Sequence, residues 1–222
     1  MRKIILNTML LTITGAFLSG CGLDNYDAPK SVVTGKVVYN GRNIGVKGTG
    51  STVQLELWQP GYDLYTAIPV YVTQDGSFQT EIFDGDYKLV AKSGTGPWVS
   101  SQDTVDVTVK GATTCEYPVT PFYTISNENF SLNGSTLTAT FSVTAVAATQ
   151  QLERAILVVN KTSFVDENAQ IARADQLAPG TGQISMTLEL TEEVLSSTLL
   201  NARVGLKTEG NQAIYSSVVK IK

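Results

Sequence analysis

The sequence predicts an all-β protein that consists of two tandem β-sandwiches. From Val32 onward, apolar and polar residues alternate with a period of two, which is the pattern of strands with one buried face. These alternating runs are short and are separated by Gly, Asp and Pro residues typical of turns. Each half of the chain carries about seven such runs, at roughly the 8–12-residue spacing of a sandwich.

In the first half, three alternating runs define the expected buried faces. Their inward residues are Val53, Leu55 and Leu57, then Phe78, Thr80 and Ile82, and then Val105, Val107 and Val109. Asp75-Gly76 predicts a hairpin between Tyr71-Val72-Thr73 and Ser77-Phe78-Gln79, because this dipeptide suits a two-residue turn. Asp84-Gly85-Asp86 is expected to turn the chain again before a strand over 87–90.

The second half repeats the pattern. Asn133-Gly134 predicts a two-residue hairpin turn. The apolar run over 155–159 is typical of a strand buried on both faces, and Thr191 is expected to cap a brief helix. Residues 166–182 are expected to be less regular. Further strands are expected at 137–143, 184–190, 202–206 and 214–221.

Two sandwiches of ~90–100 residues suit domain-size statistics better than one of twice that length. The boundary is expected near Thr120-Pro121, which gives a first sandwich over 32–120 and a second over 121–222. Phe122 and Tyr123 follow directly and are expected to pack at this junction.

The N-terminal residues predict an export signal. Two basic residues precede a mostly apolar stretch over 9–18, and small residues follow, which is typical of a secretory signal. Leu18-Ser19-Gly20-Cys21 resembles the bacterial lipobox. The resemblance implies that residues 1–20 are a signal peptide and that Cys21 is diacylated as the first residue of the mature protein. Residues 21–31 would then be an acylated tether.

The residues after Cys21 bear on localisation. Asp24 and Asp27 are either a solvated linker or an acidic export cue of the kind many Bacteroidota surface lipoproteins carry. Gly22 resembles outer-membrane sorting. Beyond the signal, no apolar run approaches the ~20 residues that cross a bilayer. We therefore expect a protein that is anchored to the outer membrane by lipid on Cys21 and exposed at the cell surface.

Composition argues against several classes of function. The net charge is −4, and it becomes −6 without residues 1–20, which hold two basic residues and no acidic one. This acidic balance disfavours nucleic acid, which is bound through Lys and Arg. The chain has no histidine, so it lacks Ser-His and Cys-His nucleophiles and His-containing zinc sites. Carboxylate-pair catalysis stays open.

No cofactor or metal is expected. Asp75, Asp84 and Asp86 are assigned to turns in preference to a calcium site, because no ligand loop surrounds them. Acylation of Cys21 leaves Cys115 without a disulfide partner, and we expect Cys115 to be a small buried residue.

The first sandwich resembles the transthyretin-like, or carboxypeptidase-regulatory-like, family. The residues that carry the resemblance are Thr34-Gly35-Lys36-Val37 and the segments 73–78 and 84–89. These are turn and core positions, so they imply a prealbumin-like architecture and no chemistry. The segment over 42–51 departs from the short proline-containing connection of that family.

The whole chain resembles a Bacteroidota lipoprotein family known as domain of unknown function 3823. The resemblance runs from the lipobox and residues 22–27 through the first sandwich to Pro121-Phe122-Tyr123-Thr124-Ile125 and the strand over 137–143. The second sandwich looks immunoglobulin-like. Members typically lie beside SusC/SusD-type polysaccharide-uptake genes. The resemblance therefore implies an accessory surface lipoprotein of glycan acquisition, with a polysaccharide or oligosaccharide and SusC/SusD-like proteins as partners.

Four aromatic residues are the candidate ligand-binding residues. Trp58, Tyr62 and Tyr65 surround a turn and could form a stacking platform, or they could seal the domain edge. Trp98 lies on a Gly/Pro loop, where it either contacts a ligand or pins its own loop. We expect all four to share one exposed face if they bind glycan.

The leading hypothesis is thus a non-enzymatic glycan-binding surface lipoprotein. The alternative is a purely structural spacer or protein-docking subunit without glycan affinity. The third is an esterase or glycosidase, for which no residue is assigned a catalytic role.

Overall fold

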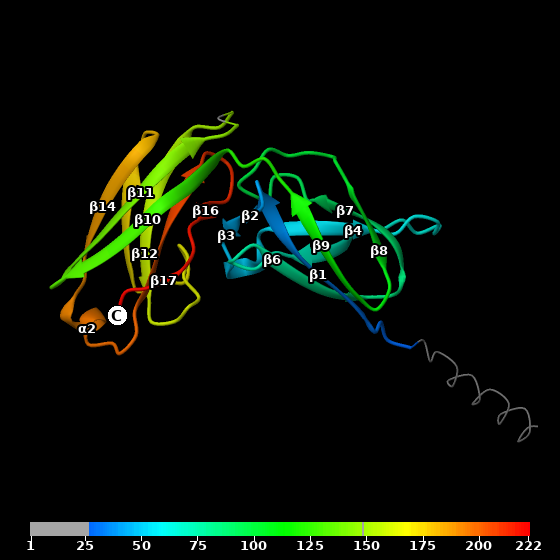
Figure 1. Ribbon diagram of the computed structural model, residues 1–222, viewed down its shortest axis with the longest axis horizontal. Helices are drawn as coiled ribbons and strands as arrows, with labels where there is room; N and C mark the ends of the chain where they lie inside the picture. Colours follow the sequence, from blue (N-terminus) through cyan, green and yellow to red (C-terminus); the bar gives the residue numbers. More distant parts are fainter. Residues whose placement is uncertain (1–26, 148) are drawn as a thin grey trace, which may run out of the picture. The chain divides into compact units, whose positions relative to one another are not determined.

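The computed structural model describes residues 27–147 and 149–222 and confirms an all-β chain with two sandwiches in tandem (Figure 1). Residues 1–20 and Cys21 lie outside the described residues. Residues 31–222 form one compact unit. Within the described part of the chain, no helix has the length and apolar character to cross a membrane.

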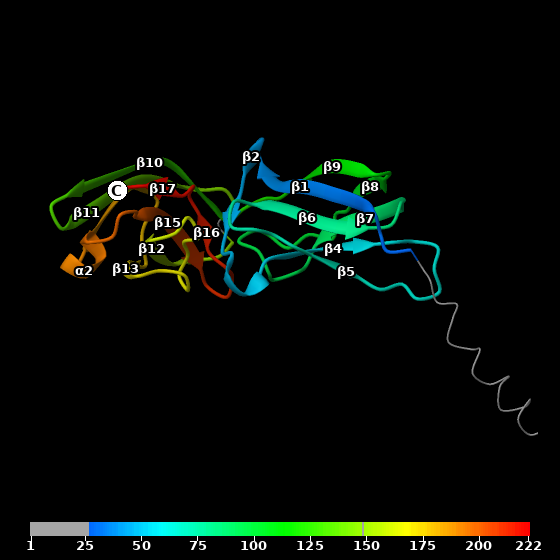
Figure 2. The same cartoon turned by 90° about the horizontal axis from the view of Figure 1, so that it is seen from below.

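The first sandwich packs two four-stranded sheets face to face (Figure 2). One sheet contains β1 (Ser31–Tyr39), its antiparallel neighbours β2 (Arg42–Asn43) and β6 (Ser77–Ile82), and its parallel neighbour β9 (Ala112–Pro118). The other has the order β5 (Ile68–Tyr71), β4 (Gln54–Trp58), β7 (Gly85–Ala91) and β8 (Val105–Val109). Leu55 and Leu57 are fully buried between the sheets, as the alternation predicts.

The second sandwich has a three-stranded sheet and a larger sheet, to which the first half of the chain also contributes a strand. The three-stranded sheet has the order β10 (Tyr123–Asn133), β11 (Thr136–Ala145) and β14 (Gly182–Glu189). The larger sheet has the order β13 (Ala172–Leu177), β12 (Leu152–Asn160), β15 (Asn201–Thr208), β16 (Ile214–Tyr215) and β3 (Gly45–Val46), and β17 (Val219–Lys220) also pairs with β15. The helix α2 (Glu192–Leu195) begins after Thr191, whose hydroxyl accepts the Val194 N–H as predicted.

Strand β12 is buried on both faces, which confirms the expectation from its continuous apolar run. Ala155, Leu157 and Val159 belong to the main core, which extends through both sandwiches. Ile156 and Val158 belong to a second cluster on the other face of the sheet. The remaining buried members of that cluster are Val165, Ala213 and Tyr215. A loop therefore covers the outer face of this sheet.

Both predicted hairpin turns form, and the second differs in its turn residues. The Asp75-Gly76 turn forms, with the Gly76 N–H donating to the Thr73 carbonyl at 2.9 Å. The predicted hairpin is confirmed by an antiparallel bridge between Val72 and Phe78 and by the Thr73 N–H, which donates to the Ser77 carbonyl at 2.8 Å. Beyond this short pairing, β5 and β6 lie in different sheets, so the chain crosses between layers at this turn. The second predicted hairpin joins β10 and β11, but Asn133 pairs with Thr136, so its turn residues are Gly134-Ser135. Gly134 has a φ of 61°, as a type II′ turn requires of its first residue.

The region over 166–182 contains a strand that the sequence did not predict. Strand β13 pairs with β12 along one edge of the larger sheet. Apolar and polar residues do not alternate regularly along β13, because none of its side chains is fully buried. An edge strand that is held mainly by backbone hydrogen bonds leaves little periodic signal in the sequence.

The atypical segment over 42–51 gives a strand to the other sandwich. Val46 pairs with Ile214 and Gly45 with Tyr215, so β3 extends the larger sheet of the second sandwich. The first sandwich thus completes a sheet of its neighbour, and the segment departs from a short connection because it has this second role.

A buried arginine fixes this crossing. Arg203, on β15, is 1% exposed and donates to the carbonyl oxygens of Val46 and Gln74 at 3.4 and 3.1 Å. It also donates to the carbonyls of Val165 and Ser216, both at 3.1 Å. Burial lowers the Arg203 pKa to about 10, so the guanidinium is still charged at neutral pH. Its charge is therefore met by backbone dipoles from both sandwiches.

A buried aspartate makes the complementary contact. Asp166, in the loop after β12, accepts the Gly48 and Thr49 N–H groups at 3.0 and 2.8 Å and the Thr49 hydroxyl at 3.0 Å. The N–H groups of Asn168 and Ala169 also donate to it. Burial alone would raise the Asp166 pKa, but these hydrogen bonds outweigh it and hold the pKa below its ordinary value.

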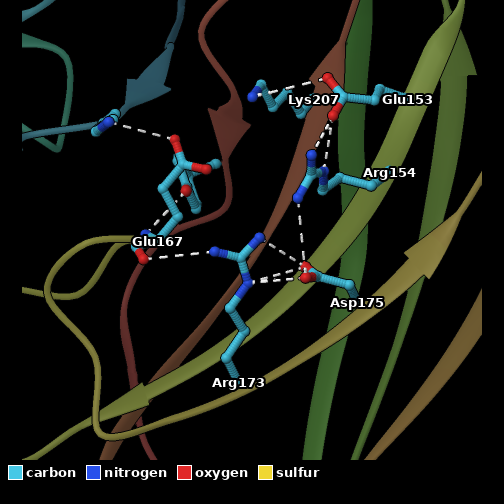
Figure 3. Close-up of polar contacts among 8 residues, drawn as sticks. Glu153, Arg154, Glu167, Arg173, Asp175 and Lys207 are labelled. Atoms are coloured by element: carbon cyan, nitrogen blue, oxygen red, sulfur yellow. Dashed lines mark hydrogen bonds and ion pairs between the residues drawn. The ribbon is translucent and has the colours of Figure 1, made fainter.

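Charged side chains surround this contact on the larger sheet. Glu167, next to Asp166, forms an ion pair with Lys47 of the first sandwich at 3.4 Å. Arg173 lies against Asp175 at 2.9 Å, and Glu153 accepts from Arg154, as Figure 3 shows. Lys207 approaches Glu153 at 3.7 Å. This network pairs acidic and basic side chains across β12, β13 and β15. The surface of the larger sheet therefore has no extended patch of one charge.

We predict that Asp166→Asn lowers the free energy of unfolding by about 1–3 kcal/mol at pH 7, because the amide cannot accept all the donors that face the carboxylate. The folded-state pKa is depressed, so this contribution is complete above the ordinary carboxyl pKa near 4 and is lost as pH falls through the lower folded value. Denaturant titrations of both proteins should therefore converge below about pH 4. Asp63→Asn, in an exposed loop, is the control; a difference that is constant with pH would contradict the assignment.

Candidate functional site

Three aromatic residues, two of them exposed, lie at the end of β4 and in the loop that follows. We call Trp58, Tyr62 and Tyr65, with the turn between them, the aromatic loop. Because Leu55 and Leu57 face the core, strand alternation places Trp58 on the outer face of β4. The Tyr65 ring packs against the Trp58 ring with centroids 4.8 Å apart and planes inclined by 40°. The Trp58 indole N–H donates to the Glu56 carboxylate at 3.2 Å, which orients the ring.

The aromatic loop leaves a large apolar surface open. Tyr62 is 63% exposed, Tyr65 is 52% exposed, and Leu64 between them is 83% exposed. Lys88 pairs with Trp58 across β4 and β7 and forms an ion pair with Asp106 at 2.7 Å. The hydrogen bond from Lys88 to Asp106 raises the Lys88 pKa, so a cation borders the rings. The structure thus brings Trp58 and Tyr65 into contact, with polar groups at their edge, and leaves Tyr62 exposed on the same loop.

Trp98 is a correction to the predicted site. It is 3% exposed and bridges to Pro121, so the expectation that it shares an exposed face with the other three is wrong. The Val99 N–H donates to the Thr120 carbonyl at 2.9 Å, and the Phe122 N–H donates to the Pro97 carbonyl at 3.2 Å. The Gly/Pro loop therefore folds back onto the junction between the sandwiches, and Trp98 pins it there.

The junction itself packs as expected. Phe122 and Tyr123 are both buried and belong to the core that extends through the two sandwiches. The Tyr123 hydroxyl donates to the Gln150 carbonyl at 2.9 Å. These rings are structural, as the sequence analysis anticipated.

The acidic turn residues and the thiol have structural partners. Asp84 accepts from the Ser31 hydroxyl and from the Gly111 N–H, and the Ser31 bond is the main cause of its lowered pKa. Asp75 accepts from the hydroxyls of Thr73 and Ser77. In the described ranges, no three His, Cys, Asp or Glu side chains are grouped as a metal site would require. Cys115 is half-buried, and burial raises its pKa, so its thiol stays protonated at neutral pH.

A concave surface that was not predicted from the sequence lies between the two sandwiches. This interdomain groove has a volume of about 1020 Å³ and is lined by residues of the β1–β2 hairpin, of β10 and of the segment over 214–218. Asn40-Gly41, with φ of 48° and 72°, forms the turn between β1 and β2 and could have been recognised as a hairpin dipeptide. Asn127, with a φ of 55° at a bulge in β10, gave no signal in the sequence.

Two family models match the chain. The N-terminal domain of the protein of unknown function DUF3823 matches residues 31–120, and the domain of unknown function DUF3823_C matches residues 123–220. No curated protein matches the sequence.

Solved structures agree with the family models. A DUF3823 family protein from Parabacteroides merdae is 38% identical with a TM-score of 0.84, over 88% of this chain and 100% of that one. A second, from Bacteroides ovatus, is 33% identical with a TM-score of 0.80, over 86% and 98%. A Bacteroides uniformis protein described as a "putative carbohydrate binding protein" is 19% identical with a TM-score of 0.71, over 87% and 99%, and shares the fold. Both sandwiches are matched in order and at identities above 30%, and the chain therefore belongs to the DUF3823 family.

Proposed function

We propose that this protein is a non-enzymatic surface lipoprotein that binds glycan through the aromatic loop, as an accessory component of a SusC/SusD-type polysaccharide-uptake system. The observation that carries the proposal is the contact between the half-buried Trp58 ring and the exposed Tyr65 ring, with exposed Tyr62 on the same loop. Aromatic rings offer flat apolar faces on which the C–H faces of sugar rings stack, and the tyrosine hydroxyls can hydrogen-bond sugar hydroxyls.

The position of these rings favours recognition over folding. Exposed Tyr62, Leu64 and Tyr65 contribute little to the core, and contiguous apolar patches on a surface typically mark interaction sites. They lie on a loop held by a rigid sandwich, which is a common place for binding residues. The Bacteroides uniformis relative of the same fold, described as a "putative carbohydrate binding protein", points to the same class of ligand.

The proposed lipid anchor would hold the binding surface outside the outer membrane. Diacylation of Cys21 would hold the mature chain at the outer membrane, because two acyl chains anchor stably where one binds reversibly. A polysaccharide outside the cell could then reach the sandwiches at the end of the tether.

A protein-docking role is the second candidate. Leu64 is the most exposed large apolar residue of the aromatic loop, and an aliphatic side chain suits a protein partner better than a sugar. In this case the rings would contact a SusC/SusD-like protein, and the chain would have no glycan affinity.

We predict that Trp58→Ala and Tyr65→Ala each weaken polysaccharide binding by about tenfold or more, since one lost stacking contact of ~1.4 kcal/mol has this effect. The assay is affinity gel electrophoresis of the soluble mature chain in gels that contain xylan, mannan, arabinan, starch or mixed-linkage β-glucan. Tyr71→Ala is the matched control, because Tyr71 is an exposed tyrosine on β5 outside the aromatic loop.

The outcomes separate the two candidates. Retardation of the wild-type chain that the Trp58 and Tyr65 variants lose supports glycan binding. If no polysaccharide retards the wild-type chain, glycan binding by the aromatic loop is wrong. Co-purification with an outer-membrane transporter that Leu64→Ser abolishes would then support docking.

We predict that Cys21→Ser abolishes incorporation of an alkyne-labelled palmitate and moves the protein out of the membrane fraction, because serine offers no thiol for acylation. In-gel fluorescence and cell fractionation measure the two effects. Cys115→Ser is the matched control and should keep both the label and the membrane location, since Cys115 lies in β9 of the folded domain. Label retained by Cys21→Ser would refute the lipobox assignment.

A further inference from the structure

The interdomain groove has the size of a ligand site. Its volume of about 1020 Å³ lies at the upper end of small-molecule pockets, which run to roughly 1,000 Å³. One wall is the β1–β2 hairpin of the first sandwich, and the other is β10 with the connection from β16 to β17. The aromatic loop contributes no residue to it.

Both walls are held in defined conformations. The Asn40-Gly41 turn, with two positive φ angles, sets Tyr39 opposite Arg42 in the β1–β2 pair. The Asn43 side-chain amide donates to the Asp75 carbonyl at 3.4 Å. The hairpin therefore presents Tyr39, Arg42 and Asn43 on a short, pre-organised element.

The opposite wall carries a strained residue. Asn127 has a φ of 55°, in the left-handed region, where the register of β10 and β11 shifts between Ser126 and Asn129. Such an angle at a non-glycine residue costs on the order of 1 kcal/mol or more, and bulges often redirect side chains beside functional sites. The Asn127 amide donates to the Ser142 hydroxyl at a long 3.4 Å, which leaves most of its hydrogen-bonding capacity open.

The groove offers polar groups without partners. Within the described ranges, neither Arg42 nor Glu128 forms an ion pair or a side-chain hydrogen bond, although both line the groove. Ser126 and Ser217 belong to the same lining. Together these side chains supply both donors and acceptors, which is what an array of sugar hydroxyls requires.

The charge of the lining disfavours an anionic ligand. The positive charge of Arg42 is balanced in the lining by the negative charges of Asp75 and Glu128, without a direct ion pair. The guanidinium of Arg203 in the groove floor is already engaged by backbone carbonyls and lies over the Tyr215 ring. No net positive charge is therefore left to attract a carboxylate or sulfate.

We propose that the interdomain groove binds a short stretch of an uncharged oligosaccharide, with Arg42, Asn43, Asn127 and Glu128 as its hydrogen-bonding residues. The proposal rests on the proposed glycan-binding function and adds a second site to it, separate from the aromatic loop. The half-buried Tyr39 supplies an aromatic surface in the groove. Such a site would recognise the individual sugar units of the oligosaccharide through their hydroxyls. The aromatic loop would instead contact the polymer by stacking.

The test is isothermal titration of the soluble mature chain with xylohexaose, mannohexaose, maltohexaose and cellohexaose, and with hexagalacturonate as the charged probe. Asn127→Gly removes the amide and tolerates the positive φ, so it avoids the strain that alanine would bring. We expect Asn127→Gly and Asn43→Ala each to weaken binding of the neutral hexasaccharide by about tenfold or more. Asn133→Ala, at the far end of β10, should bind as the wild type does.

The results distinguish this proposal from that of the aromatic loop. Trp58→Ala should leave hexasaccharide binding within about twofold of wild type while it loses retention in polysaccharide gels. Hexasaccharide binding that is unchanged in Asn127→Gly and Asn43→Ala would overturn the groove proposal alone. Preference for hexagalacturonate, or no binding of any neutral hexasaccharide, would also overturn it. If Asn127→Gly and Asn43→Ala weaken hexasaccharide binding but Trp58→Ala does not change retention in polysaccharide gels, the aromatic-loop proposal alone is overturned. Thermal unfolding midpoints of the variants verify that they are folded.

Discussion

A buried arginine and a buried aspartate hold the two sandwiches of this chain together. Arg203 is surrounded by carbonyl oxygens and Asp166 by N–H and hydroxyl donors, and most of these groups are backbone atoms. A buried charge is tolerated only when its hydrogen bonds are satisfied, and removal of the partners costs several kcal/mol. The hydrogen bonds to Arg203 and Asp166 therefore fix the position of the segment over 44–49. The neighbouring β1–β2 hairpin is positioned with it.

This constraint gives the two proposed binding surfaces different physical characters. The walls of the interdomain groove come from different sandwiches, yet the contacts of Arg203 and Asp166 hold them in a fixed relation. A ligand that enters the groove therefore pays little to order the protein, which favours specific hydrogen bonding. The aromatic loop depends on one sandwich alone and presents ring faces, which discriminate weakly between sugars. The two surfaces are suited to selecting and to retaining a polymer, respectively.

The sequence predicted what depends on local patterns. Leu55 and Leu57 face the core because period-two alternation is a property of the strand itself, and Thr191 caps its helix through a contact three residues away. The sequence left Trp98 between ligand contact and pinning its own loop, because a Gly/Pro loop favours exposure, whereas its burial depends on contact with Pro121 in a later segment. The aromatic loop was found because its members are close in sequence. The groove was not, because its walls come from residues that only the folded chain brings together. Arg203, a charge within an apolar strand, was the available sign of a buried contact.

The polar contacts also explain why so short a strand keeps its register. Strand β3 pairs through only Gly45 and Val46, which by themselves would allow a slip along β16. Arg203 binds the Val46 carbonyl, and Asp166 binds the N–H groups of Gly48 and Thr49, so a shift by one residue would break these hydrogen bonds of both buried charges. The position of Gly45 is equally restricted. A Cβ there would lie 2.5 Å from the Tyr215 carbonyl oxygen and 2.9 Å from an Arg203 nitrogen, so a larger residue would force the strand away from the arginine. The register of β3 is thus determined by the fit around Arg203, and the number of ladder hydrogen bonds is secondary.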